Sequence, residues 1–210
     1  MSKFEKLLFI ILMGSLWGAL ELFGGDQLRA WGVPNKSALL FGLGLIILYA
    51  SKRVVNFAGS PVIMALIAGL FKTVSSNFYP CQFAAIVING IIFDGAYGFY
   101  KNQLNSSPIY RSMAAPVITI LSFAVFAFFA TYVLQQVNWV ERGLKGIGEY
   151  IYTDGLMASL ISILTINLGY YLGTALRSYF ESRKADLPFA FFRVISISVV
   201  AVIWIAGQIY

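Results

Sequence analysis

The sequence predicts an all-α fold: a polytopic transmembrane bundle of six to seven helices that forms one integral membrane domain over residues 1–210. Two observations favour this class. Hydrophobic residues make up 59% of the chain and charged residues only 11%, whereas about a quarter of the residues in an ordinary soluble domain are charged. The apolar residues also gather in segments, most of which have about the 20 residues that a helix needs to cross a bilayer.

Four apolar segments lie in the first half of the chain, at 7–25, 37–50, 55–72 and 82–100. The first follows a basic N-terminus and lacks the small-residue cleavage site of a signal peptide, so we expect it to be retained. The second is short and is weakened by Gly42 and Gly44; it is expected to be tilted, to continue into 51–58 or to cross incompletely. The third contains a Gly-Ser-Pro break at 59–61, so its helix should begin near Pro61.

Three more apolar segments follow, at 112–136, 156–176 and 188–208. Between the first two of these, the segment 137–155 mixes Trp139, Tyr150 and Tyr152 with charged residues and glycines. This mixture predicts an interfacial helix with an aromatic belt, and a lid over an outward-facing pocket is the alternative.

Lysine and arginine are more frequent in the loops on the N-terminal side of the predicted membrane than in those on the other side. The positive-inside rule therefore predicts a multi-pass protein of the cell membrane with a cytoplasmic N-terminus. The net charge of +6 is then explained by topology and by contact with the lipid bilayer. We expect no nucleic-acid partner, because no basic stripe with interleaved aromatic residues lies on a polar segment.

The residue types argue against several chemistries. A single cysteine, Cys81, cannot form a disulfide within the chain, and the lack of histidine removes the commonest ligand of transition metals and the commonest general base. The sequence contains no P-loop, so we do not expect the chain to hydrolyse ATP unaided. The sequence therefore predicts no metal, no cofactor and no enzymatic activity.

The first apolar segment carries a glutamate within a stripe of glycines. On a helix, Gly14, Gly18, Glu21 and Gly25 fall on one face, because steps of three and four residues return to the same side. Small residues at this spacing let another backbone approach closely, so we expect Glu21 to face protein or a cavity rather than lipid. Trp17, four residues earlier, is expected to line the same pocket wall. A carboxylate satisfied by its structural neighbours is the alternative.

Lys72 ends the third apolar segment, and the predicted topology puts it at a depth similar to that of Glu21. One interpretation is an ion pair; the other is a site where the two residues bind opposite poles of a zwitterionic or polar substrate. Asn77 and Tyr79 follow in a polar loop and are expected to complete the wall of this site. Asn167, in the sixth segment, is expected either to bind the same ligand or to hydrogen-bond a neighbouring helix.

Asp94 interrupts the apolar segment 82–100 and shares a helical stripe with Gly90 and Gly98. It lies in the predicted inner half of its span, as Arg193 does in the last segment. We therefore predict a buried Asp94–Arg193 ion pair that fixes helix register. A proton or cation site at Asp94 is the alternative.

The chain resembles the substrate-binding membrane subunits (S components) of energy-coupling factor (ECF) transporters. The resemblance covers residues 1–176 and rests on chain size, the pattern of apolar segments and the small-residue stripe Gly14-Ser15-Leu16-Trp17-Gly18. Members of that family are small, very hydrophobic helix bundles that bind a vitamin or similar micronutrient from outside. A small-residue motif on their first helix docks a transmembrane coupling subunit, which works with a pair of ATPase subunits. The resemblance thus implies that Gly14 and Gly18 dock a partner.

The sequence as a whole predicts a membrane-embedded subunit that binds a small, vitamin-like micronutrient for uptake, energised by partner ATPase subunits. Two alternatives stay open. One is a secondary transporter that couples to ions through Asp94. The other is a non-transporting scaffold subunit of a membrane complex.

Overall fold

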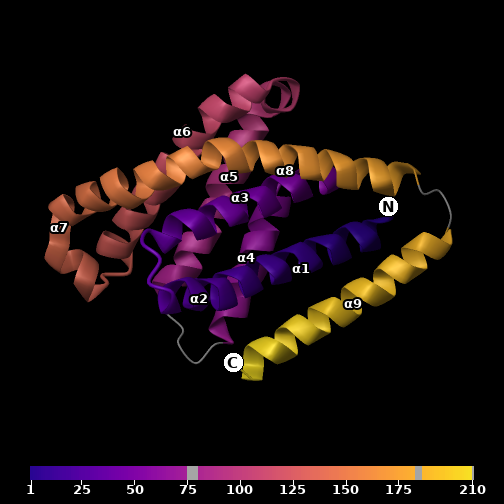
Figure 1. Ribbon diagram of the computed structural model, residues 1–210, viewed down its shortest axis with the longest axis horizontal. Helices are drawn as coiled ribbons and strands as arrows, with labels where there is room; N and C mark the ends of the chain where they lie inside the picture. Colours follow the sequence, from indigo (N-terminus) through magenta and orange to yellow (C-terminus); the bar gives the residue numbers. More distant parts are fainter. Residues whose placement is uncertain (75–79, 183–185, 210) are drawn as a thin grey trace.

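The computed structural model describes residues 1–74, 80–182 and 186–209, which fold almost entirely into helices. In this described part no strand is present, and six helical stretches are long and apolar enough to cross a membrane. They are Lys3–Ala30, Lys36–Val55, Pro80–Ser106, Pro108–Val133, Val137–Ser182 and Ala190–Ile209. The predicted all-α bundle of a multi-pass membrane protein is therefore confirmed, and Figure 1 shows its arrangement.

The N-terminal stretch is a helix interrupted by one wide turn. α1 (Lys3–Ala19) begins at a capping box, in which the Ser2 hydroxyl accepts from the Glu5 amide and the Glu5 carboxylate accepts from the Ser2 amide. A π-helical turn at Leu20–Gly24 then leads into α2 (Gly25–Ala30). Such a turn holds one residue more than an α-helical turn, so it rotates the side chains after it relative to those before it.

α3 (Lys36–Val55) and α4 (Ser60–Thr73) come next. The second apolar segment continues beyond residue 50, which is one of the three outcomes that the sequence left open. The Gly-Ser-Pro break starts α4 as predicted, with Pro61 in its first turn. The helix that is too short is α4, which corresponds to the third apolar segment and not to the second. Its 14 residues are fewer than the roughly 20 that cross a bilayer.

The remaining helices follow in the order α5 (Pro80–Ser106), α6 (Pro108–Phe128), α7 (Val137–Tyr150), α8 (Leu156–Ser182) and α9 (Asp186–Ile209). Further π-helical turns, at Phe129–Val133 and Ile151–Gly155, follow α6 and precede α8. Gly143 within α7 has a φ of 56°, which glycine adopts without the steric cost that other residues incur. The segment 137–155, which was predicted to be an interfacial helix or a lid, therefore contains a helix with an internal kink.

α3 and α8 lie side by side through the middle of the bundle (Figure 1). Glycines on α8 allow this close approach: a Cβ added at Gly173 would lie 2.7 Å from the Cα of Ala50. At Gly169 it would lie 2.9 Å from the carbonyl oxygen of Ile46. Two long spans therefore meet with their backbones nearly in contact, as small residues permit in membranes.

α9 lies at the edge of the bundle beside α1 and runs in the same direction (Figure 1). Arg193 forms an ion pair with Glu5 near the start of both helices, with Nη2 and Oε1 2.6 Å apart. Further along, Trp204 Nε1 donates to the hydroxyl of Ser15 at 2.9 Å. Two polar contacts therefore fix the register of this last helix.

The glycine stripe of α1 packs against α4 of the same chain. A Cβ at Gly14 would lie 2.9 Å from Ile67 Cβ, and one at Gly18 would lie 2.6 Å from Phe71 Cβ. Both glycines are buried. The structure therefore gives Gly14 and Gly18 a contact within the chain and not a free surface for the predicted partner subunit. The spacing does permit close backbone approach, but α4 already occupies the face.

Candidate functional site

A cavity of about 210 Å³ lies at the end of the bundle where α2 and α7 are found, on the left in Figure 1. Its walls come from the ends of α4, α6 and α7, from the starts of α3 and α5, and from α2 with the turn that joins it to α1. Both charged groups and aromatic rings line it.

Glu21 projects from the π-helical turn after α1 into the cavity wall. Its Oε1 accepts a hydrogen bond from Trp17 Nε1 at 3.3 Å. Trp17 is fully buried behind this wall, and its indole fits against Gly44, where a Cβ would come within 2.7 Å of Nε1. Trp17 therefore positions Glu21, whereas the sequence predicted that both residues would line the cavity.

Lys72, in the last turn of α4, lines the same cavity and is only 8% exposed. The structure thus brings Glu21 and Lys72 to one site. No ion pair joins them, and within the described residues no other carboxylate pairs with Lys72 either. A buried ammonium group without an anion in direct contact is costly, so an anionic group of a ligand beside Lys72 would be stabilised.

Three more charged residues belong to the same part of the wall. Asp26 and Arg29 on α2 form an ion pair with a separation of 3.9 Å, and Lys36 begins α3. Beside it, Ser37 donates a hydrogen bond to Asp154 at 2.5 Å, which ties α3 to the turn before α8. The wall therefore contains two carboxylates and three cations, and the cations are in excess.

Aromatic rings form another part of the cavity wall. Phe123 on α6 stacks on Tyr150 at the end of α7, with ring centroids 5.2 Å apart and planes inclined by 26°. Trp139 holds Tyr150 from the other side in an edge-to-face contact at 4.9 Å. Phe41 meets Phe123 edge-on at 5.5 Å. These contacts fix the rings in place, so they present a rigid apolar surface to the cavity.

Ser122, next to Phe123 on α6, lines the cavity with a buried hydroxyl that has no hydrogen-bond partner among the described residues. Other buried hydroxyls in these helices are satisfied: Thr119 donates to the Ala115 carbonyl and Ser159 to the Gly155 carbonyl, both at 2.8 Å. The hydroxyls of Ser51 and Ser196 are likewise unpaired among the described residues, but they do not line the cavity. Ser122 differs because its hydroxyl lies in the cavity wall, where a ligand atom could pair with it.

The other predicted substrate-binding residues are not brought to this cavity. Asn77 and Tyr79 lie outside the described residues. Asn167 lies deeper in the bundle, where its amide bridges two helices: Oδ1 accepts from Arg111 Nε at 2.9 Å and Nδ2 donates to Ser112 Oγ at 3.0 Å. Asn167 does not line the cavity, and its contacts are those of the alternative prediction, a hydrogen bond to a neighbouring helix.

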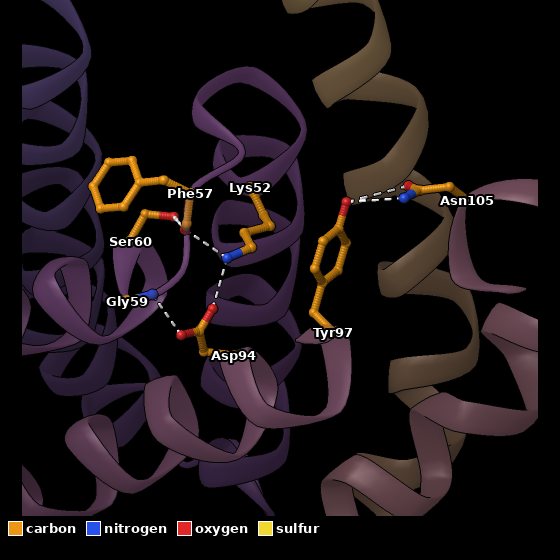
Figure 2. A network of polar contacts seen from close by, with 7 residues as sticks. All are labelled: Lys52, Phe57, Gly59, Ser60, Asp94, Tyr97 and Asn105. Atoms are coloured by element: carbon orange, nitrogen blue, oxygen red, sulfur yellow. Dashed lines mark hydrogen bonds and ion pairs between the residues drawn. The ribbon is translucent and has the colours of Figure 1, made fainter. Parts of the chain in front are cut away.

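Asp94 belongs to a separate polar cluster near the far end of α3, which Figure 2 shows. One carboxylate oxygen accepts from Lys52 Nζ and the other from the Gly59 amide, both at 2.7 Å. Lys52 also donates to the Phe57 carbonyl at 2.7 Å. Asp94 thus ties α5 to α3 and to the connection between α3 and α4.

This cluster is far from the cavity. At about 1.5 Å of rise per residue, Lys52 lies about 24 Å along α3 from Lys36, which lines the cavity.

The predicted Asp94–Arg193 ion pair is wrong. Asp94 pairs with Lys52, and Arg193 pairs with Glu5. The physical reason is the order in which the helices pack, because α9 lies against α1 and not against α5. Lys52 was not identified as its partner, because it lies just beyond the apolar segment 37–50 and the continuation of that span into 51–58 was left open. In the structure α3 extends to Val55 and carries Lys52 into the bundle.

Sequence reasoning missed several residues that line the cavity: Asp26, Arg29, Lys36, Gln82, Asn89 and Ser122. Asn89 stands out in the sequence as a polar group within an apolar segment. Ser122 gives no comparable signal, because serine is common in membrane helices and usually bonds to its own backbone. Only the packing of α6 reveals that this hydroxyl is unpaired.

Within the described residues, no three histidine, cysteine, aspartate or glutamate side chains are grouped closely enough to hold a metal ion. The cavity instead offers ammonium, guanidinium, carboxylate, amide and hydroxyl groups next to rings, a combination suited to a small organic molecule. No protein-family model matches this chain, and neither a curated protein nor a solved structure matches it.

Proposed function

We propose that this chain is a membrane-embedded binding subunit that captures a small, polar, vitamin-like micronutrient in the cavity between α2 and α7. One observation carries the proposal. The ammonium group of Lys72 and the hydroxyl of Ser122 are buried in the wall of the same cavity, and neither has an ion-pair or hydrogen-bond partner among the described residues. Each is unfavourable in the empty protein, and each becomes favourable when a polar ligand binds.

The proposal places the cavity on the outer side of the cell membrane, with the N-terminus in the cytoplasm. The support is the excess of lysine and arginine in the loops on the N-terminal side of the predicted spans. It further assigns the energy for uptake to a transmembrane coupling subunit and ATPase subunits. The support here is the resemblance to ECF S components and the lack of a nucleotide-binding motif in the sequence. Because α4 covers Gly14 and Gly18, the coupling subunit would have to dock on another surface.

Native mass spectrometry of the gently purified full chain tests the proposal. We expect a bound small molecule that is lost when Lys72 is replaced by glutamine. We also expect ATPase subunits to copurify when the chain is extracted at native expression levels. A chain that carries no small molecule, and that binds none from a cell extract, would contradict the binding role.

The ion-coupled alternative depends on Asp94 being free to bind a proton or cation. Both Asp94 oxygens are occupied by Lys52 and the Gly59 amide, so the geometry favours a structural role for this carboxylate. We therefore expect the purified chain alone, in liposomes with a proton or sodium gradient, not to accumulate the micronutrient. Accumulation that stops in Asp94→Asn would instead support the secondary transporter.

A further inference from the structure

We infer that the cavity ligand is a small zwitterion that carries a carboxylate, a protonated nitrogen and one flat ring. This inference rests on the proposed function, since it names the chemical class of the ligand. It follows from where the unpaired charges and the rings lie in the wall.

The carboxylate of the ligand belongs beside Lys72. This ammonium group is 8% exposed and has no paired anion among the described residues. Lys36, half-buried in the same wall, likewise has no ion pair there, while Arg29 is already paired with Asp26. The hydroxyl of Ser122 is a donor of the kind that a carboxylate accepts.

The protonated nitrogen of the ligand belongs beside Glu21. Within the described residues this carboxylate accepts one side-chain hydrogen bond, from Trp17 to Oε1, and has no ion pair. An ionised carboxylate has room for several donors, so most of its accepting capacity is available to a ligand. Glu21 and Lys72 line the same wall, and no ion pair joins them. They can therefore bind the positive and the negative group of one ligand separately.

The ring of the ligand belongs against Phe123 and Tyr150. Their stacked pair is held by Trp139 and Phe41, so it can receive a flat ring without rearranging. The volume of about 210 Å³ lies below the roughly 300 Å³ at which sites for drug-sized molecules begin. The cavity therefore suits one ring with short substituents better than a large fused system.

Four probes built on one benzene ring test the inference by separating the two charges. Benzyl alcohol carries no charge, benzoate a carboxylate, benzylamine an ammonium group, and 4-(aminomethyl)benzoate both. The measurement is the ligand-induced rise in the unfolding temperature of the full chain in lipid nanodiscs, relative to the same protein without probe. We expect the largest rise with 4-(aminomethyl)benzoate and a smaller one with benzoate.

Three cavity variants assign the charges to residues. Lys72→Gln should remove the advantage of benzoate over benzyl alcohol, a loss of about tenfold or more in affinity for one charge-assisted hydrogen bond. Lys72→Arg should keep that advantage, which guards against a folding defect. Glu21→Gln should remove the advantage of the zwitterion over benzoate and leave benzoate binding intact. As the matched control, Arg177→Gln changes an exposed cation on α8 outside the cavity and should alter none of these differences.

Two results would overturn the inference. One is an equal response to all four probes; the other is a charge preference that survives in both Lys72→Gln and Glu21→Gln. The native ligand separates this failure from failure of the proposed function. If an uncharged molecule copurifies with the chain, the binding role stands and the zwitterion is wrong. If no probe and no natural molecule binds, both are wrong.

Discussion

Replacing Asp94 by asparagine is expected to destabilise the protein because it leaves Lys52 buried without its counter-ion. The Lys52 side chain is 5% exposed and that of Asp94 16%, so solvent screens the pair only weakly. Removing one partner of a buried ion pair costs about 3–5 kcal/mol. Asparagine can still accept from the Gly59 amide, and Lys52 keeps its bond to the Phe57 carbonyl, so we expect the lower end, about 3 kcal/mol.

For a chain of this length, 1 kcal/mol corresponds to about 2–4 °C in Tm, so we expect Asp94→Asn to lower it by roughly 6–12 °C. The assay is thermal unfolding in nanodiscs, followed by tryptophan fluorescence. Combining Asp94→Asn with Lys52→Met should recover more than half of the loss, because the uncompensated charge is then gone. A loss in Asp94→Asn below about 1 kcal/mol, or a double variant no more stable than Asp94→Asn alone, would refute the reasoning.

Two further predictions concern the packing around α1. Gly18→Ala should cost about 1–3 kcal/mol, because its Cβ would lie 2.6 Å from Phe71 Cβ and force α1 away from α4. Gly95→Ala, where nothing lies within 4 Å, is the matched control and should leave Tm unchanged or higher; equal effects of the two would contradict the α1–α4 contact. Arg193→Gln should cost about 1–3 kcal/mol: the Arg193 side chain is 46% exposed, but its partner Glu5 is only 4% exposed and loses a charged hydrogen-bond donor. Its effect should add to that of Asp94→Asn in the double variant, and strong coupling between them would contradict the separate pairs described above.

The candidate site could be predicted in part from the sequence. Glu21 and Lys72 are charged residues within apolar segments, and the expense of such charges in lipid indicates that they turn inward. The structure does place both on one cavity. The rest of the wall escaped prediction, because Ser122 and Phe123 look like ordinary residues of a membrane helix until the packing of α6 is known.

The sequence by itself determined the membrane helices and several of their boundaries. Composition decides the class, because so many apolar side chains have no other environment in which to be buried. Local signals decide the helix starts at Ser2 and Pro61, since capping and proline geometry depend only on neighbours along the chain.

Only the tertiary structure decided which helix covers which face. The glycine stripe of α1 predicts close packing, but nothing local to it distinguishes α4 from a partner subunit. The same holds for Asp94, which pairs with Lys52 rather than with Arg193. The physical reason is that helical periodicity shows which side of a helix is buried, while apolar helices of similar composition are nearly interchangeable as neighbours. Their order in the bundle is set by the sum of all contacts, and the π-helical turn after α1 further changes the direction in which later residues point.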